Sequence, residues 1–386
     1  MGAFFIAARM LPLTRRIGDR RGLSTMIASR EIRLKSRLVG MPGADNFELV
    51  TVPVPRPAPG EVQVQNLWMT VDPYMRGRMA DRAIYTASSR PGTEVPAGAI
   101  GKIAASNSTM YGWRPNFQVG ETLQGGAIGE VAASDDPRFK PGDLVSSWLG
   151  WRERFNAPAG NLQKLDTFGL PPQAFLGVAG MPGLTAWVGL LKIAIPKPGD
   201  VVFVSAASGA VGSVACQIAK LKGHTVIGSA GGEAKCAFVK HIGADQVIDY
   251  KATGDLTEAL LRVASSGIDV YFENVGGEHL EAALAAANPF ARFAICGMIS
   301  QYNATELPNG PRNIMFVMGK SLRLEGYDIA NYLDLMPEFQ REMSGWIHEG
   351  KVTWRETIDH GIENAPAAFL KLFRGENFGK MLVKLG

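Results

Sequence analysis

Apolar residues between positions 201 and 223 change their spacing once, and this change marks the centre of the predicted fold. Residues 201–204 (VVFV) form a continuous apolar run, which is typical of a parallel strand buried on both faces. From Ala210 onward, apolar residues recur with a helical period as far as about Gly223. Residues 205–212 (SAASGAVG) lie between the two patterns, so the sequence predicts a strand, a turn of small residues and a helix in immediate succession.

Short apolar runs and helical patterns continue to alternate after this segment. Each run is bounded by turn residues and followed by a stretch with helical spacing. Alternating strands and helices predict an α/β fold with a doubly wound parallel sheet, the Rossmann arrangement. The predicted strands cover residues 201–206, 224–230, 246–250, 268–275, 290–297 and 322–327.

The chain before this region shows a different pattern, in which short strands are separated by glycine and proline. Apolar residues cluster or alternate at 47–52, 61–70 and 127–133, and sequences such as FKPGD (139–143) are typical of turns. This pattern predicts an all-β unit, either a barrel or a sandwich.

The predicted elements divide the chain into three structured parts. After a predicted helix at 333–348, the chain ends in an apolar strand, KMLVKL, which we expect to return to the first unit. We therefore expect a β domain at residues 26–165, a parallel-sheet domain at 166–345 and a returning segment at 346–386.

The turn after the first strand of the parallel sheet carries a glycine pattern found in dinucleotide sites. It reads Ala207-x-Gly209-x-x-Gly212, so alanine replaces the first glycine of GxGxxG. Small residues let the backbone approach a pyrophosphate, and the helix start offers unpaired N–H groups to it. The alternative interpretation is an ordinary tight turn between a strand and a helix.

The end of the second predicted strand indicates which dinucleotide is preferred. Sites for NAD usually carry Asp or Glu there to bind the ribose 2′-hydroxyl. Here the strand ends in residues 228–232 (GSAGG) without a carboxylate, and the nearest one, Glu233, falls in the next helix. Lys235 follows at a position suited to a 2′-phosphate, which favours NADP, although a solvated helix lysine is the alternative.

Charge is concentrated at the beginning of the chain. The 386 residues carry a formal net charge of +4 at pH 7, and residues 1–25 account for it with five arginines and one aspartate. Residues 26–386 are therefore neutral overall, which indicates no nucleic-acid partner. The tail superficially suits a transit peptide, but it has few hydroxyl residues, and we interpret residues 1–25 as a dispensable extension.

The cysteines indicate the compartment. Cys216, Cys236 and Cys296 form no CxxC pair, which argues against a disulfide framework and favours a reducing, cytoplasmic location. No apolar run is long enough to span a bilayer, so we expect no membrane partner.

Several other segments add to the glycine pattern. They are VDPYMRGRM (71–79), GMPGLTAW (180–187), AASGAVGS (206–213), FENVGG (272–277), CGMISQYN (296–303) and NFGKMLVKL (377–385). Taken together, they resemble the zinc-independent medium-chain dehydrogenases/reductases, in the branch of prostaglandin and leukotriene reductases, plant alkenal double-bond reductases and bacterial curcumin reductases. The resemblance covers nearly all of residues 27–386. It implies a GroES-like β-barrel domain, a Rossmann domain and an active site in the cleft between them.

The residues and the resemblance agree on a reaction without metal. Zinc alcohol dehydrogenases of this superfamily need Cys and His ligands in and just after the first domain. No Cys or His precedes Cys216 here. The resemblance implies an NADPH-dependent oxidoreductase that reduces the C=C bond of α,β-unsaturated aldehydes and ketones. A hydride adds to the β-carbon, negative charge spreads to the carbonyl oxygen as an enolate, and a proton follows.

Two tyrosines are the candidates for contact with this substrate. Tyr302 follows the fifth predicted strand, at the sheet edge where open α/β folds bind ligands, and its phenol can donate a hydrogen bond to the enolate. The resemblance gives Tyr302 the catalytic role; the alternative is packing on the nicotinamide ribose. Tyr74 resembles a tyrosine of the family's substrate pocket, although Asp72, Pro73 and Arg76 suit a structural turn with an ion pair equally well.

The resemblance also implies the cofactor-binding residues, with Lys235 and Tyr250 at the 2′-phosphate. The polar sequence at 327–329 (YDI) departs from the family pattern, which leaves substrate size open. Cys296 has no histidine nearby in sequence, so we expect a small buried thiol and not a nucleophile. The expected cofactor-binding residues are Ser208, Gly209, Ala210, Val211, Gly212, Lys235, Tyr250, Asn274, Cys296, Gly297, Met298, Ile299, Ser300, Tyr327, Asp328, Ile329 and Asn377.

Two other functions stay open at this point. A quinone reductase of the same superfamily would share the NADPH domain, although VDPYMR and CGMISQYN favour the enone branch. A non-enzymatic binding role, as in lens crystallins, conflicts with the intact cofactor positions. Family analogy implies a homodimer, and the sequence does not decide between a lipid aldehyde, a plant phenolic enone and a prostanoid as the substrate.

Overall fold

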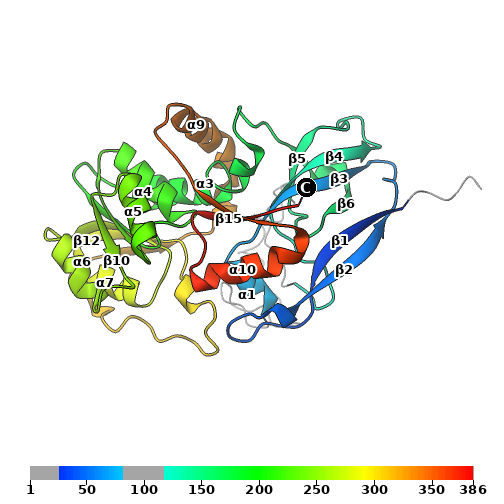
Figure 1. Ribbon diagram of the computed structural model, residues 1–386. Coiled ribbons are helices and arrows are strands. Elements are labelled where there is room, and N and C mark those ends of the chain that lie inside the picture. The colour runs from blue at the N-terminus through cyan, green and yellow to red at the C-terminus, as the bar shows by residue number, and fades with distance from the viewer. Residues whose placement is uncertain (1–25, 81–116, 386) are drawn as a thin grey trace, which may run out of the picture.

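The described residues form a six-stranded sheet, a seven-stranded sheet and a separate two-stranded pair, and the two large sheets lie in two lobes with the C-terminal strand β15 between them (Figure 1). The computed structural model describes residues 26–80 and 117–385. The expected N-terminal extension, residues 1–25, lies outside the described residues. Across the described ranges, every helix is too short or too polar to cross a membrane.

One lobe, which we call the Rossmann lobe, contains a six-stranded parallel sheet. Its strand order is β10-β9-β8-β11-β12-β13, so the order reverses between β8 and β11, and the carboxyl ends of strands at such a reversal are where open α/β sheets bind ligands. The predicted doubly wound sheet is therefore confirmed. The strands are β8 (Val201–Val204), β9 (Thr225–Ala230), β10 (Gln246–Asp249), β11 (Ile268–Glu273), β12 (Ala287–Ile295) and β13 (Arg323–Gly326).

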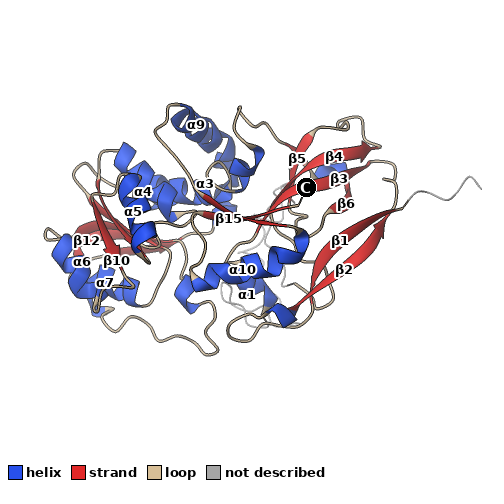
Figure 2. Cartoon of the chain, viewed as in Figure 1, coloured by secondary structure: helices blue, strands red, loops and turns tan. Residues whose placement is uncertain are grey.

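Helices cover both faces of this sheet (Figure 2). Apolar residues of α3, α4, α5 and α9 pack in one core cluster, and those of α6 and α7 pack in another on the opposite face. The helix after the glycine pattern begins at Gly212, two residues later than its apolar spacing predicts. The helices are α3 (Met181–Val188), η5 (Gly189–Ala194), α4 (Gly212–Leu221), α5 (Glu233–His241), α6 (Leu256–Val263), α7 (Glu278–Ala286), η6 (Ile299–Gln301), α8 (Met315–Gly319), η7 (Ile329–Leu335) and α9 (Met336–His348).

The second lobe, the β lobe, is built from strands at both ends of the chain. Its main sheet has the order β14-β15-β3-β4-β5-β7, β6 pairs with β3, and β1 and β2 form a separate antiparallel pair. The strands are β1 (Ile27–Leu34), β2 (Phe47–Val54), β3 (Glu61–Thr70), β4 (Ala127–Ser134), β5 (Leu144–Ser147), β6 (Arg154–Pro158), β7 (Gln163–Lys164), β14 (Glu356–His360) and β15 (Lys380–Lys384). The helices are η2 (Ala44–Asn46), α1 (Met75–Met79), η3 (Ala159–Asn161), η4 (Pro172–Leu176), η8 (Ile362–Asn364) and α10 (Ala365–Arg374).

The C-terminal strand joins the β lobe in the centre of the molecule. β15 pairs antiparallel with β3 and parallel with β14, and Figure 1 shows it between the two lobes. Just before β15, Gly379 forms an isolated bridge with Gly209 of the glycine pattern. The last strand therefore contacts both lobes.

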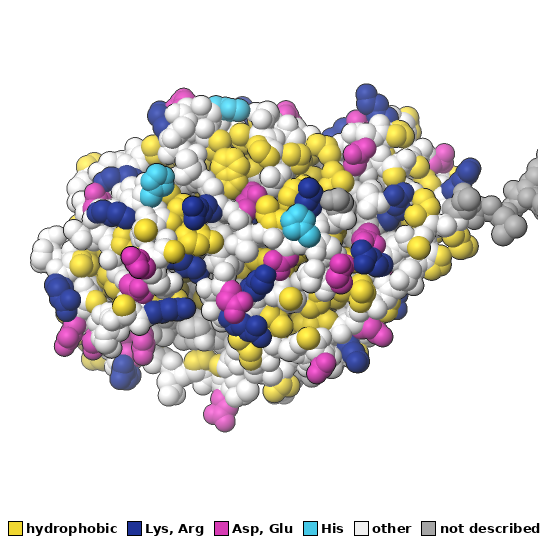
Figure 3. Space-filling model, in the orientation of Figure 1, with side chains coloured by type: hydrophobic (Ala, Val, Ile, Leu, Met, Phe, Trp, Pro, Cys, Tyr) yellow, Lys and Arg dark blue, Asp and Glu magenta, His cyan; other side chains and the backbone are white. Residues whose placement is uncertain are grey.

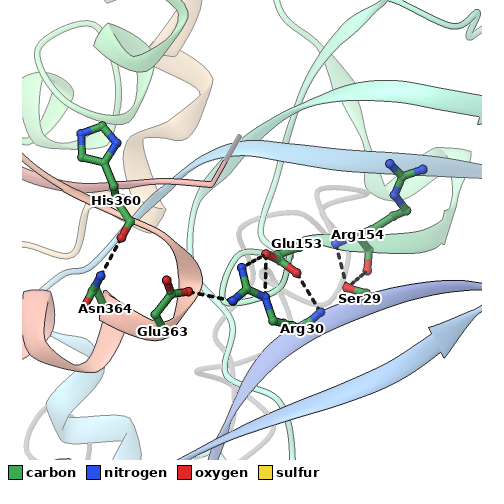
Figure 4. A network of polar contacts seen from close by, with 7 residues as sticks. All are labelled: Ser29, Arg30, Glu153, Arg154, His360, Glu363 and Asn364. Carbon is green, nitrogen blue, oxygen red and sulfur yellow. Dashed lines mark hydrogen bonds and ion pairs between the residues drawn. The ribbon is translucent and has the colours of Figure 1, made fainter.

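A polar network fastens the returning segment to the first strand of the β lobe (Figure 4). The Arg30 guanidinium binds Glu153 through Nη2 (2.6 Å) and Glu363 of η8 through Nη1 (3.0 Å). Hydrogen bonds to these carboxylates raise the pKa of Arg30. On the face seen in Figure 3, basic and acidic side chains are interspersed, as the neutral charge of residues 26–386 leads one to expect.

Candidate active site

The loop between β8 and α4 is shaped by a close backbone approach. A Cβ on Gly212 would lie 2.3 Å from the carbonyl oxygen of Ala206, so glycine lets the start of α4 pass this close. Ala206 has a φ of +48°, which is uncommon outside glycine. Within the described residues, no acceptor binds the N–H groups of Ala210, Val211 and Gly212. These donors at the start of a helix form an arrangement that binds phosphate.

The alanine at the first position of the glycine pattern is accommodated by a glycine on the neighbouring strand. A Cβ on Gly228 would lie 2.9 Å from the Cβ of Ala207 and 2.6 Å from Cγ1 of Val239. The Ala207 methyl therefore occupies space that a side chain on β9 would fill. Its backbone N–H donates to the carbonyl oxygen of Ser229 on β9 (2.8 Å). The departure from GxGxxG thus leaves the close packing of loop and strand intact.

The end of β9 forms a second polar site, where two lysines approach a glycine turn. Lys235, half-buried on α5, donates from Nζ to the carbonyl oxygen of Gly375 after α10 (2.8 Å). Burial, and then the charge of Lys251, lower the pKa of Lys235. A Cβ on Gly231 would lie 2.7 Å from the Tyr250 hydroxyl and 2.9 Å from Cε of Lys251. Two cations beside this turn suit an anion such as a 2′-phosphate.

A carboxylate of β10, that of Asp249, also lies at this turn and is bound by backbone N–H groups. Oδ1 of Asp249 accepts hydrogen bonds from the N–H groups of Gly232 (2.9 Å) and Lys251 (3.0 Å). The half-buried Tyr250 ring lies edge-on to His279, with 5.2 Å between ring centroids. Burial lowers the pKa of His279 to about 4 and raises that of Tyr250, so both rings are neutral at pH 7.

A buried carboxylate joins the ends of β8 and β11. Oε1 of Glu273 accepts hydrogen bonds from the Ser205 hydroxyl (3.1 Å) and the N–H of Gly276 (2.9 Å). Burial raises the pKa of Glu273. Asn274, a candidate cofactor residue, donates from Nδ2 to the carbonyl oxygen of Ser205 (2.8 Å). The Asn274 amide thus connects the carboxyl ends of β8 and β11.

The segment after β12 folds back over the end of β11 and carries Tyr302. The N–H of Ile299 donates to the carbonyl oxygen of Asn274 (3.2 Å). Tyr302 is 7% exposed, and its hydroxyl accepts a hydrogen bond from the N–H of Met298 (3.3 Å). Burial raises the pKa of Tyr302 to about 12. The phenol is therefore protonated at neutral pH.

Three other candidate residues belong to the same segment. A Cβ on Gly297 would lie 3.0 Å from the Tyr302 hydroxyl, so glycine leaves room for the phenol. Ser300 is exposed, and its N–H donates to the carbonyl oxygen of Val275 (3.1 Å). Burial raises the pKa of the Cys296 thiol to about 12. Cys296 is therefore a neutral thiol at pH 7, without the thiolate that a nucleophile needs.

In the polar sequence at 327–329, the side chain of Tyr327 points into the core. The Tyr327 hydroxyl donates to the carbonyl oxygen of Thr185 on α3 (2.8 Å). A Cβ on Gly189 would lie 2.3 Å from that hydroxyl, so the approach depends on glycine. Asp328 is exposed and caps the start of η7, and Ile329 is half-buried. The Tyr327 ring therefore packs against α3 and η5. The backbone that follows β13 lies at the carboxyl edge of the sheet.

The β lobe contributes Tyr74 and a buried ion pair. Tyr74 is half-buried and directly precedes α1. Two residues earlier, Asp72 forms an ion pair with Lys380 of β15 and accepts a hydrogen bond from the Thr70 hydroxyl (2.9 Å). The ion pair expected for this turn thus joins Asp72 to Lys380 and not to Arg76.

The segment before β15 completes the glycine loop from the other side. The N–H of Gly379 donates to the carbonyl oxygen of Ser208 (3.0 Å). Asn377, a candidate cofactor residue, is half-buried and donates from Nδ2 to the carbonyl oxygen of Gly379 (3.0 Å). Ser208 and Asn377 are therefore both hydrogen-bonded to Gly379.

The structure gathers most of the expected residues along one edge. The glycine loop, the turn with Lys235, the Asn274 turn and the Tyr302 segment all follow carboxyl ends of parallel strands. Tyr327 is the exception, because its side chain points into the core. Lys251 was not among the expected residues, although its position directly after Tyr250 was a usable signal.

Comparisons with known proteins agree with this architecture. A family model described as the N-terminal domain of oxidoreductase matches residues 30–113 and 110–165, and one described as zinc-binding dehydrogenase matches residues 210–347. The NADPH-dependent curcumin reductase of Escherichia coli (strain K12) is 38% identical over 358 residues, which cover 91% of this chain and 95% of that protein. The NADP⁺-dependent 2-alkenal reductase of Nicotiana tabacum is 37% identical, covering 92% of this chain and 97% of that protein.

A solved structure shows the same fold. The crystal structure of CurA in complex with NADPH from Vibrio vulnificus superposes with a TM-score of 0.81 at 40% identity, covering 92% of this chain and 99% of that chain. The Rossmann lobe with its glycine loop, joined to a β lobe, defines a medium-chain oxidoreductase. The chain belongs to the zinc-independent medium-chain dehydrogenase/reductase family, in the branch of curcumin, 2-alkenal and prostaglandin reductases. Among its described residues, no group of three or more His, Cys, Asp or Glu is placed to hold a metal.

Proposed function

We propose that this protein is an NADPH-dependent reductase of the C=C bond in α,β-unsaturated aldehydes and ketones. The observation that carries the proposal is a buried, protonated Tyr302 phenol on the same sheet edge as the glycine loop. The relatives support the same reaction class, because they are named a curcumin reductase and a 2-alkenal reductase. Family membership supports an oxidoreductase that acts on a small molecule.

The residues at the sheet edge fit NADPH. The N–H groups of Ala210, Val211 and Gly212 would bind its pyrophosphate. Lys235 and Lys251 would bind its 2′-phosphate, since each is a cation beside a glycine turn. A carboxylate at the end of β9 would repel that phosphate; residues 230–232 carry none, and Oδ1 of Asp249 at this turn is engaged by two backbone N–H groups. These features favour NADPH over NADH.

The proposed reaction needs one hydride and one proton. When bound, NADPH supplies a hydride, with its electron pair, for the β-carbon of the substrate. The π electrons of the C=C bond shift toward the carbonyl oxygen, and the Tyr302 hydroxyl donates a hydrogen bond to this developing enolate. A proton from solvent then reaches the α-carbon and completes the saturated product. Tyr74, at the start of α1, is proposed to line the substrate pocket from the β lobe.

We propose the remaining expected residues as cofactor contacts. The Asn274 amide binds the carbonyl oxygen of Ser205, and the Asn377 amide binds that of Gly379. Residues 296–300 directly precede the segment that carries Tyr302. For residues 327–329 we propose a backbone contact, because the Tyr327 ring packs in the core. The division into domains at 26–165, 166–345 and 346–386 is likewise proposed.

We further propose a homodimer in the cytoplasm. β13 is an edge strand of the described sheet, and large apolar side chains nearby are exposed: Phe290 (72%), Met315 (66%) and Met318 (72%). Exposed apolar side chains beside an open edge suit a second copy of the chain. The free cysteines favour a reducing compartment.

The proposed function is tested by following NADPH oxidation with a medium-chain 2-alkenal. We expect consumption of the alkenal with the saturated aldehyde as product, and much slower turnover with NADH. A simple quinone, run in parallel, tests the alternative quinone reductase. Tyr302→Phe should lower kcat without weakening NADPH binding. Consumption of the quinone alone would refute the enone reaction and the role of Tyr302.

A further inference from the structure

Arg76 is a buried cation whose partners come from distant parts of the chain. It lies on α1 and is only 3% exposed. Its Nε donates to Oδ1 of Asn303 (3.0 Å), and its Nη2 donates to the carbonyl oxygen of Gly40 (2.8 Å). With the described residues it forms no ion pair, since both acceptors are neutral. Arg76 therefore links α1 to the segment after β12 and to the connection between β1 and β2.

The two segments that Arg76 holds also contact each other. Nδ2 of Asn303 lies 3.1 Å from Sδ of Met41, so both ends of the Asn303 amide are engaged. A Cβ on Gly40, where φ is +63°, would lie 3.5 Å from Cγ2 of Thr305. In Figure 1 the blue connection between β1 and β2 lies beside the loop after β12 at the lower edge of the molecule. These contacts fix the loop after Tyr302 against the β lobe.

Both candidate substrate tyrosines are close in sequence to the residues that form this hydrogen bond. Tyr302 directly precedes Asn303, and Tyr74 lies two residues before Arg76. The bond between Arg76 and Asn303 thus connects the backbone that carries one tyrosine to the backbone that carries the other. We propose that Arg76 is a positioning residue that fixes Tyr302 relative to the pocket wall of the β lobe during enone reduction. This inference rests on the proposed function.

A role in packing alone does not explain an arginine at this position. Burial lowers the pKa of Arg76, and no carboxylate among the described residues pairs with its guanidinium. An apolar side chain would fill the same volume without this desolvation. The planar guanidinium, however, directs two hydrogen bonds to two separate loops, which an apolar side chain cannot do. The arrangement therefore favours orientation over packing.

The test compares Arg76→Met and Asn303→Leu with the wild type in alkenal reduction. We expect each variant to lower kcat by about a hundredfold, because a misplacement of about 1 Å is enough for such a loss. The Kd for NADPH should stay within about twofold, since the glycine loop and the lysines proposed to bind its phosphates are untouched. In a Tyr302→Phe background, Arg76→Met should cost less than about threefold, because the lost group is the one that Arg76 positions.

Arg154→Met is the matched control. Arg154 also donates to neutral side-chain oxygens of the β lobe, Oε1 of Gln65 (2.9 Å) and Oε1 of Gln63 (3.4 Å), but it lies on β6 away from Asn303. This variant should keep the wild-type kcat. Equal losses from Arg76→Met with and without Tyr302, or a loss confined to thermal stability, would overturn the positioning role.

A second readout separates this inference from the proposed function. Hydrogen exchange of a peptide covering residues 298–306 should be faster in Arg76→Met than in the wild type, and unchanged in Arg154→Met. If the wild type reduces no alkenal while hydrogen exchange rises in Arg76→Met, the proposed function is refuted, but the conclusion that Arg76 restrains residues 298–306 is retained. If the wild type is active and neither kcat nor exchange responds to Arg76→Met, the inference fails alone.

Discussion

Burial, and then the charge of nearby Lys251, lower the pKa of Lys235 at the end of β9. Two cations that repel each other gain most from an anion placed between them. We predict that Lys235→Ala weakens NADPH binding by about tenfold or more, in line with a lost charge-assisted hydrogen bond of about 1.5–3 kcal/mol, and changes NADH binding little. Lys251→Ala should act in the same direction.

The measurement is the Kd of each nucleotide by nicotinamide fluorescence or calorimetry. Lys240→Ala is a suitable control, because Lys240 lies on the same helix but its Nζ donates to the carbonyl oxygen of Asp245. Equal losses for NADPH and NADH would remove both lysines from the 2′-phosphate site.

Because of His279, we expect the free energy of unfolding to decrease as the pH falls. Burial lowers its pKa in the folded protein to about 4, below the value of about 6.5 expected when unfolded. As pH falls below 6.5 the unfolded chain binds a proton that the folded chain does not, so stability is lost between pH 6.5 and 4. At pH 5 this loss amounts to about 2 kcal/mol.

His279→Gln should therefore reduce the difference in unfolding free energy between pH 7 and pH 5 by about 2 kcal/mol. Urea unfolding at the two pH values measures this difference. For the wild type and for the variant, the value at pH 5 is compared with the same protein's value at pH 7. An unchanged difference would show that other groups cause the acid sensitivity.

Individual residues show where sequence reasoning reaches its limit. The glycine pattern and Lys235 could be predicted, because their spacing from a buried strand follows from the fold. Tyr327 could not be oriented, since its direction depends on room left by Gly189, which is far away in sequence. The hydrogen bond between Arg76 and Asn303 could not be predicted either, because it joins residues of different lobes.

The C-terminal strand β15 is the element that connects the two lobes. Its first residue, Lys380, is 4% exposed and pairs with Asp72 of the turn that carries Tyr74. Lys380→Met would leave the Asp72 charge without its partner in a poorly solvated site, and we predict a loss of about 3 kcal/mol in unfolding free energy. Adding Asp72→Asn should recover part of this loss, because no uncompensated charge then remains.

Urea unfolding of the two single variants and the double variant measures the coupling. Lys351→Met is the control, since its ion pair with Glu349 is exposed and should contribute little. Additive effects of Lys380→Met and Asp72→Asn would show that the pair is not a stabilising unit.

Elements with a clear period were predictable, and their ends were less so. The buried strands of the parallel sheet follow the apolar runs closely, since burial on both faces requires such runs. The start of α4 was displaced, because residues 209–211 belong to the glycine loop although their spacing suits a helix. The predicted helix at 333–348 divides into η7 and α9, with Pro337 in the first turn of α9.

For the whole molecule, the parallel sheet and its binding edge follow from the alternation of strands and helices. The way the lobes meet does not, because it depends on contacts such as Gly379 with Ser208 that join residues far apart in sequence. The open edge of the sheet is a further property of the whole molecule. β13 has a paired neighbour on one side in the described sheet, and Met315 and Met318 are exposed close by in sequence.

This edge leads to a prediction about assembly. If the edge binds a second copy, charged residues at its exposed methionines should block association, since they would have to be desolvated in the interface. We predict that the wild type is a dimer by light scattering and that the double variant Met315→Glu, Met318→Glu is a monomer with wild-type circular dichroism. Leu49→Glu, on the exposed face of β2, should leave the dimer intact. A monomeric wild type would contradict the proposal, and a dimeric double variant would move the interface to another face.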